Sequence, residues 1–104
     1  MDKKGDIEMI TNEKFLRLCR RKVAEYENKR VDIKEEIDAD DVFSVWTCKT
    51  LQNSKCLMST LVKGAYYYEF TYNGDRGEIY MDIYKKVENI PLDENGKRIV
   101  ERVK

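Results

Sequence analysis

The sequence contains no histidine, and this absence removes more functional classes than any other feature of the chain. Without an imidazole there is no Ser-His or Cys-His nucleophile pair and no histidine general base. Mixed Cys/His zinc sites are removed for the same reason. Three cysteines are present, Cys19, Cys48 and Cys56, and no two of them form a C-x-x-C pair. We therefore expect buried thiols that act as small apolar side chains in a reducing compartment.

The sequence also lacks the segments that carry a chain into or across a membrane. No apolar run approaches the roughly 18 residues that a membrane-spanning helix needs. The first ten residues mix charged and apolar side chains and lack the apolar core of a signal peptide. We therefore expect a cytoplasmic protein with no membrane partner.

Neither sign of charge is in excess, since 20 basic side chains balance 20 acidic ones. Nonspecific nucleic-acid binders usually carry a clear basic excess, so this balance counts against that class. A glycine-rich phosphate loop is missing, because Gly74 and Gly77 stand in a turn between strand-like segments rather than before a helix. Carboxylate pairs for acid-base chemistry can be drawn from Glu69, Glu78 and Asp82, but a chain this rich in acids always offers such pairs. We expect no enzymatic activity, no cofactor and no bound metal.

What is present fits one small domain. At 104 residues the chain is long enough to bury roughly two thirds of its surface around one core. Most aromatic residues, including the only tryptophan, fall within residues 41–84, so we expect the core there. We divide the chain into a mobile leader (1–10), a single globular domain (11–90) and a polar C-terminal arm (91–104).

A helix over about residues 12–29 is the strongest local prediction. Thr11 fits an N-cap, and Ile10 and Phe15 have the spacing of a hydrophobic staple around it. Helical periodicity places one apolar stripe on this segment, made of Phe15, Leu16, Leu18, Cys19, Val23 and Tyr26. The opposite, basic face comprises Lys14, Arg17, Arg20 and Arg21. This face either binds phosphate groups or is a solvated surface.

Residues 31–41 form a strongly acidic segment directly after the basic helix. We expect the two opposite charges to attract each other across the intervening turn. The acids at 38, 40 and 41 could also bind a divalent cation, but the segment lacks the glycine and the glutamate of a calcium-binding loop.

The secondary structure of the segment around Trp46 is ambiguous. Asp38 has the position of a helix cap, and Val42, Val45 and Trp46 follow at helical spacing. The β-branched and aromatic residues of the same segment also suit a buried strand. We favour a second helix over residues 39–52, with Asn53 as its left-handed C-terminal residue.

From Lys55 onward the apolar residues alternate. Residues 56–62 and 65–72 are typical of two antiparallel strands, and residues 78–83 of a third. The second of these strands places four aromatic residues on one face, namely Tyr66, Tyr68, Phe70 and Tyr72. Asn73-Gly74 then provides a turn.

The fold class that follows is α+β. An N-terminal helix, together with the second helix over residues 39–52, packs on one face of a three-stranded antiparallel meander. Two segments stay open in this prediction. Residues 84–89 fit a strand and a helix, and residues 97–104, after a turn at 93–96, fit a hairpin arm and a frayed helix.

Three stretches carry a family resemblance: VWTCKTLQNSK, YYYEFTYNGD and EIYMDIYKKVEN. In these the chain resembles an uncharacterised family of small proteins encoded by phages and prophages of Gram-positive bacteria. The similarity covers residues 37–89 and is most specific at residues 45–46, 48–53 and 72–75. The resemblance implies a phage setting and no particular activity.

Two polar or aromatic groups are candidates for binding a ligand. The first, at an expected element end, consists of Lys49, Thr50, Gln52 and Asn53. Such residues either grip a ligand or cap and turn the chain. The second is the tyrosine-rich strand at 66–72, which could stack nucleic-acid bases, although core packing explains it better.

Trp46 is the residue whose role matters most. As the only indole of a small domain it is expected to anchor the core, sharing a helical face with Val42 and Val45. The alternative is an exposed contact residue at an interface.

The leading functional hypothesis is a non-enzymatic binding protein or inhibitor that engages a host or anti-phage defence protein. The alternative is a nucleic-acid-associated protein that uses the basic helix face. A hydrolase built on carboxylates and a metal ion is a third, less favoured reading. The candidate binding residues are Lys14, Arg17, Arg20, Arg21, Lys49, Gln52 and Asn53.

Overall fold

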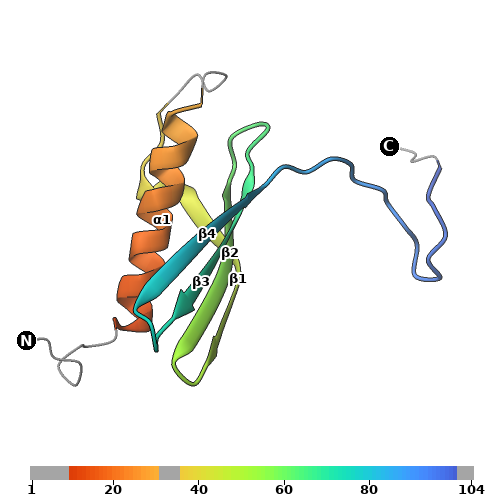
Figure 1. Ribbon diagram of the computed structural model, residues 1–104. Coiled ribbons are helices and arrows are strands. Elements are labelled where there is room, and N and C mark those ends of the chain that lie inside the picture. The colour runs from red at the N-terminus through yellow and green to blue at the C-terminus, as the bar shows by residue number, and fades with distance from the viewer. Residues whose placement is uncertain (1–9, 31–35, 101–104) are drawn as a thin grey trace, which may run out of the picture.

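The computed structural model describes residues 10–30 and 36–100, with one α-helix and a four-stranded sheet in that part of the chain (Figure 1). The α+β class and the antiparallel meander are confirmed. The leader predicted at residues 1–10 lies outside the described residues except for Ile10, as do residues 101–104 of the predicted arm.

The helix α1 (Asn12–Asn28) begins where Thr11 caps it. The Thr11 hydroxyl accepts a hydrogen bond from the Lys14 N–H at 3.1 Å, and Ile10 packs against the core. The helix ends at Asn28, whose side-chain amide donates to the Ile37 carbonyl at 2.8 Å and accepts from the Ile37 N–H at 2.9 Å. These bounds confirm the helix predicted over about residues 12–29. The sequence could predict it because the N-cap signal lies within a few residues of the helix start.

The apolar stripe of α1 is narrower than predicted. Its buried residues are Phe15, Cys19, Val23, Ala24 and Glu27. Leu16 and Leu18 are half-buried, and Tyr26 is 40% exposed, because all three lie at the edges of the stripe. The buried face of α1 therefore includes one acid, Glu27, whereas the sequence predicted only apolar side chains there.

The second helix predicted over residues 39–52 is wrong. Asp38 does act as a cap, but it caps the three-residue 3-10 turn η2 (Ala39–Asp41), and the strand β1 (Val42–Thr50) follows at once. The extended backbone suits β-branched and aromatic side chains, and pairing with the next strand satisfies the backbone groups.

The sheet has four strands, one more than predicted, in the order β1-β2-β3-β4. The three predicted strands correspond to β2 (Asn53–Thr60), β3 (Tyr67–Asn73) and β4 (Glu78–Tyr84). Asn53 opens β2 and is not left-handed. The positive φ in the β1–β2 turn belongs to Leu51, at 53°. Residues 85–89 are neither strand nor helix.

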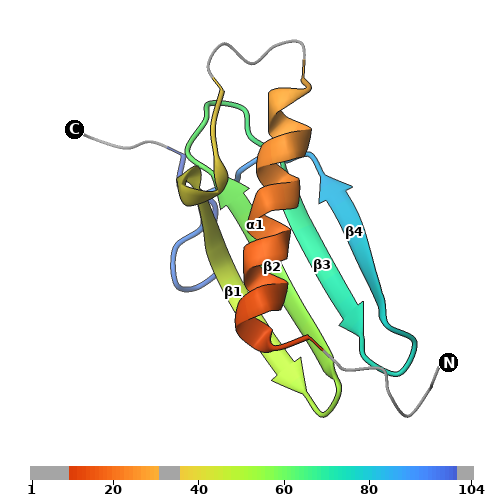
Figure 2. The same ribbon diagram turned by 90° about the vertical axis from the view of Figure 1, so that its left-hand side faces the viewer.

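One face of the sheet lies against α1, which packs on β1, β2 and β3 on that side (Figure 2). In antiparallel pairs, residues opposite each other share a face. Met58 lies opposite Tyr68, and Cys56 lies opposite Phe70. These four residues are fully buried. They form the core with Phe15, Cys19 and Val23 of α1.

A register shift in β1 turns Trp46 away from this core. Ser44 lies opposite Met58, on the face toward α1, but the shift between Ser44 and Trp46 places Trp46 opposite Leu57. One extra residue moves the following side chain to the other face. Trp46 is therefore 41% exposed, and the prediction that it anchors the core is wrong.

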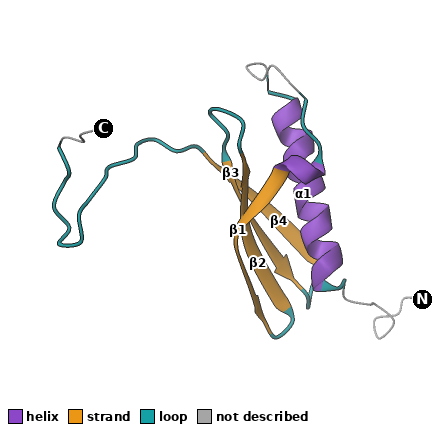
Figure 3. Ribbon diagram, turned by 180° about the vertical axis from the view of Figure 1, so that it is seen from behind, coloured by secondary structure: helices purple, strands orange, loops and turns teal. Residues whose placement is uncertain are grey.

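The described residues after β4 leave the domain. Residues 85–100, which we call the outer arm, project on the side of the sheet opposite α1 (Figures 1 and 3). A turn at residues 93–96 and a bridge between Leu92 and Arg98 fold the end of the outer arm into a short hairpin. The hairpin alternative of the sequence prediction therefore holds for the described part of that segment.

Candidate functional site

The face of the sheet opposite α1 carries most of the exposed aromatic residues of the described strands. We call it the open face. Its principal residues are Phe43, Trp46, Lys55, Leu57, Tyr67, Glu69, Glu78, Tyr80, Asp82 and Tyr84. Across the four strands, one row of neighbours runs from Trp46 through Leu57 and Glu69 to Asp82. Because side chains alternate between faces along each strand, this row also determines which other residues lie on the open face.

The aromatic part of the open face lies around β2. Phe43 and Trp46 of β1 are each 41% exposed, and Tyr84 of β4 is 50% exposed. Between them, Leu57 is half-buried and Ser59 is buried. The Ser59 hydroxyl donates to the Tyr66 carbonyl at 2.8 Å, so this small polar residue is satisfied. The rings of Phe43, Trp46 and Tyr84 are thus available for contact on either side of Leu57 and Ser59.

The polar part of the open face is mainly acidic. Lys55 forms an ion pair with Glu69 at 3.2 Å, and the Tyr84 hydroxyl donates to Glu69 at 3.2 Å. This hydrogen bond to a carboxylate raises the pKa of Tyr84. The Tyr80 hydroxyl donates to Glu78 in the same way, and this hydrogen bond raises the pKa of Tyr80. Three acids therefore accompany one lysine among the principal residues, and Arg76 of the β3–β4 turn adds a second base, which pairs with Glu78 at 3.5 Å.

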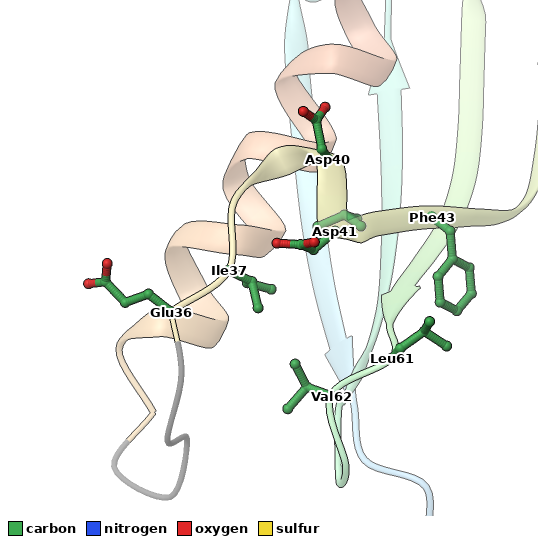
Figure 4. A pocket seen from close by; sticks show the side chains of 8 residues that line it. Glu36, Ile37, Asp40, Asp41, Phe43, Leu61 and Val62 are labelled. Carbon is green, nitrogen blue, oxygen red and sulfur yellow. The ribbon is translucent and has the colours of Figure 1, made fainter.

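A hollow of about 520 Å³ adjoins the open face at Phe43. Figure 4 shows its side chains, with Ile37 and Val62 pointing toward each other from the segment before η2 and from the β2–β3 loop. We call it the acidic hollow; it is lined by Glu36, Ile37, Asp40, Asp41, Val42, Phe43, Leu61 and Val62. The Asp41 carboxylate accepts the Asp38 N–H at 3.0 Å, whereas Glu36 and Asp40 are exposed. The acidic hollow therefore has apolar side chains in its lining, and all of its charged side chains are acidic.

The basic helix face is brought together only in part. Lys14, Arg17 and Arg21 line a second hollow of about 410 Å³ with Ile10, Leu18 and Ala39. Arg20 is not part of this lining and is half-buried. Arg17 pairs with Glu13 at 3.3 Å and Arg21 with Glu25 at 3.8 Å, so neighbouring acids offset much of this charge.

The predicted polar cluster lies at the β1–β2 turn, where its side chains hold turns in place. Lys49 donates to the Leu51 carbonyl at 2.9 Å. Gln52 donates to Asp75 at 3.0 Å, and the Asn53 side chain accepts the Gly74 N–H at 3.3 Å. The last two bonds join the β1–β2 turn to the β3–β4 turn. The acidic hollow lies at the other ends of β1 and β2, so the two groups are separate.

A buried ionic cluster was not predicted from the sequence. Glu27 has no exposed surface, and its carboxylate accepts two hydrogen bonds from Arg30, at 2.9 and 3.0 Å. It also accepts the Tyr66 N–H at 3.2 Å and the Tyr68 hydroxyl. The Arg30 guanidinium lies 3.9 Å from the centre of the Tyr66 ring. Glu27 falls four residues after Val23 on the buried stripe, and this spacing was the available signal.

The cysteines divide between core and surface. Cys19 and Cys56 are buried, and Cys48 is exposed. A hydrogen bond between Cys19 and Cys56, together with burial, raises the pKa of the Cys19 thiol. Within the described ranges, no group of three or more cysteine, aspartate or glutamate side chains is placed to hold a metal ion.

Comparisons with known proteins place the chain in a family. No match was found among curated proteins or among solved structures. In the part of the chain that the structure describes, no helix is long and apolar enough to cross a membrane. One family model matches residues 16–94, a range that runs from α1 through β4 into the outer arm and is wider than the stretch of the resemblance. The chain therefore belongs to the family of unknown function DUF6275.

Proposed function

We propose that the protein is a non-enzymatic binding protein that holds a protein partner against its open face. The observation that carries this proposal is the group of half-exposed rings at Phe43, Trp46 and Tyr84 on one side of a sheet. Aromatic residues dominate the binding energy of protein interfaces because each buries a large area with few rotatable bonds. Contiguous apolar surface on a small domain commonly marks such an interface.

The charges around the aromatic rings define the chemistry of the partner. Glu69, Glu78 and Asp82 lie on the open face, and Glu36 and Asp40 line the adjoining acidic hollow with their carboxylates directed away from Phe43 (Figure 4). Carboxylates repel phosphate groups and attract lysine and arginine. A protein segment with apolar and basic side chains therefore fits this surface better than a nucleic acid does.

The biological setting that we propose rests on the resemblance to small phage and prophage proteins. In this setting the protein is a phage accessory factor in the cytoplasm of a Gram-positive host. It acts by occupying a surface of a host or anti-phage defence protein. The lack of histidine and of a recognisable catalytic motif supports occupation of a surface rather than chemistry.

Site-specific crosslinking tests the proposal. A photo-reactive amino acid at position 46, in the full chain expressed in the host, should give a discrete adduct with another protein. The same amino acid at position 51 is the matched control, because Leu51 is 83% exposed but lies at a hairpin tip off the open face. Equal adducts from both positions, or none from position 46, would contradict a partner on the open face.

A second candidate function, binding of nucleic acid, is favoured by one observation. Lys14, Arg17 and Arg21 surround a single hollow, as phosphate-binding side chains would. Affinity for duplex DNA should then fall steeply with salt, with a log-log slope of about −0.9 for each neutralised phosphate. Binding that salt leaves unchanged, or that Lys14→Glu leaves unchanged, would remove this candidate.

A further inference from the structure

The outer arm presents apolar side chains that its own domain does not cover. Val87 and Val100 are 94% and 91% exposed, and Leu92 is 55% exposed. Within the described residues, the hydrogen bonds of residues 91–99 join this segment only to itself. Val87 and Val100 therefore gain almost nothing from the fold of a single copy, and Leu92 gains only part of what full burial would give.

The end of the outer arm nevertheless has a defined shape. The Asp93 N–H donates to the Lys97 carbonyl at 2.8 Å, and the Ile99 N–H donates to the Pro91 carbonyl at 2.9 Å. The Asp93 carboxylate accepts the N–H groups of Asn95 and Lys97, each at 2.9 Å. A two-stranded hairpin is at best marginally stable alone in water. Contact with a second surface would stabilise this hairpin.

The open face and the outer arm lie on the same side of the molecule. Figures 1 and 3 show the sheet between α1 and the outer arm, and Figure 2 shows the outer arm passing behind the sheet. The half-exposed rings of Phe43 and Trp46 show that the outer arm does not cover this face in its own copy.

The charges of the two surfaces are complementary. The outer arm carries four basic side chains, Lys85, Lys86, Lys97 and Arg98. Of its three acids, Asp93 is used inside the turn. The open face carries more acids than bases, and the acidic hollow adds Glu36 and Asp40. The outer arm therefore has the apolar and basic chemistry that the open face is suited to bind.

We propose that the outer arm of one copy docks on the open face of a second copy, so that two chains exchange arms in a two-fold symmetric dimer. Each copy supplies one arm and one face, so a two-fold axis satisfies both surfaces with a single contact made twice. This inference rests on the proposed function in one respect, since both use the open face. The second copy occupies the face until a foreign partner displaces it.

The test uses the full chain and two variants, Leu92→Asp on the outer arm and Trp46→Ser on the open face. By light scattering after gel filtration, the wild-type chain should have twice the 12.4 kDa of one chain. Each variant alone should weaken self-association by more than about tenfold, because both exchanged contacts lose an anchor. Leu51→Ser, at an exposed apolar site off both surfaces, should leave the dimer intact. Unchanged far-ultraviolet circular dichroism would show that the variants fold, because loss of a dimer can itself lower the melting temperature.

Mixing the two variants distinguishes arm exchange from other dimers. The Leu92→Asp chain keeps a normal open face and the Trp46→Ser chain keeps a normal outer arm, so a mixture should recover a heterodimer through one intact contact. A dimer that Trp46→Ser breaks and Leu92→Asp does not would overturn the proposal in favour of two faces meeting directly. A wild-type monomer would also overturn it, including one whose outer arm folds on its own face.

The outcomes separate this inference from the proposed function. A wild-type monomer that still crosslinks a host protein through position 46 keeps the proposed function and overturns arm exchange. An arm-exchanged dimer that crosslinks only to itself supports arm exchange and overturns the binding of a foreign partner.

Discussion

Glu27 shows how a single polar residue can organise the interior of a small domain. Burying a carboxylate costs several kcal/mol unless it is paired and hydrogen-bonded. Here Arg30, the Tyr66 N–H and the Tyr68 hydroxyl provide its hydrogen bonds. Arg30 also donates to the Gly64 carbonyl at 3.0 Å. The cluster therefore fastens the last turn of α1 to the loop between β2 and β3.

Removing this carboxylate should destabilise the domain strongly. Glu27→Ala removes a buried carboxylate that binds Arg30 and the Tyr68 hydroxyl, so we expect the free energy of unfolding to fall by about 3–5 kcal/mol in urea titrations. Glu25→Ala is the control on the same helix, because Glu25 is exposed and pairs only with surface side chains. It should change the stability little. Similar small losses for both variants would show that the Glu27 cluster is not stabilising.

Tyr68 should make the stability depend on pH in alkaline solution. Burial, and then the hydrogen bond to Glu27, raise the pKa of Tyr68 above its ordinary value. Above about pH 10 the hydroxyl ionises in the unfolded chain but stays protonated in the folded chain. The folded chain then binds one more proton, so the free energy of unfolding falls by up to about 1.4 kcal/mol per pH unit. This stabilisation is complete below about pH 10 and is lost as the pH rises.

The variant Tyr68→Phe isolates this contribution. It lacks the proton in question, so its free energy of unfolding should fall less steeply than that of the wild-type chain from about pH 10 to pH 11. Near neutral pH, residue 68 should add no pH dependence to the free energy of unfolding of either protein. Parallel curves above pH 10 would contradict a protonated Tyr68 in the folded state.

At the scale of the elements, the sequence predicted the features that depend on neighbouring residues. It did not predict those that depend on pairing between strands. The cap at Thr11 and the alternation within β3 lie within a few residues, and both gave the right element. Asp38 also gave a true cap, but only one 3-10 turn follows it, because the next residues pair with β2 as the strand β1. The side of the sheet that Trp46 occupies depends on a register shift between two strands. No pattern within a single strand records such a shift, so the aromatic open face was missed.

The turn between β1 and β2 offers a stabilising substitution. Leu51 has a φ of 53°, a left-handed conformation that costs an L-residue roughly 1–2 kcal/mol, and its side chain is 83% exposed. Leu51→Gly removes this strain but adds freedom to the unfolded chain, so we expect a net gain of about 0.5–1 kcal/mol in thermal or urea unfolding. Gln52→Gly should instead destabilise the turn, because it loses the hydrogen bond to Asp75. A loss of stability in both variants would contradict strain at Leu51.

At the scale of the whole molecule, the single tryptophan reports on whether the open face is covered. Trp46 is 41% exposed in one copy, so an aqueous quencher such as acrylamide should reach it in dilute solution. Association of two copies through their outer arms should protect the indole, so quenching should weaken as the protein concentration rises. The Leu92→Asp variant should be quenched equally at every concentration. Concentration-independent quenching of the wild-type chain would indicate that Trp46 lies outside any contact between copies.

The meander topology has a consequence for how the chain folds during synthesis. Each strand pairs with its neighbour in sequence through a short turn, so the hairpins can close without large loss of chain entropy. The core face of α1 has no such local partner, because it packs on residues of β2 and β3 that follow later in the chain. A ribosome delivers the N-terminal segment before the strands that cover it. Among the described elements, the helix is thus made first and can be buried only after β2 and β3 have followed.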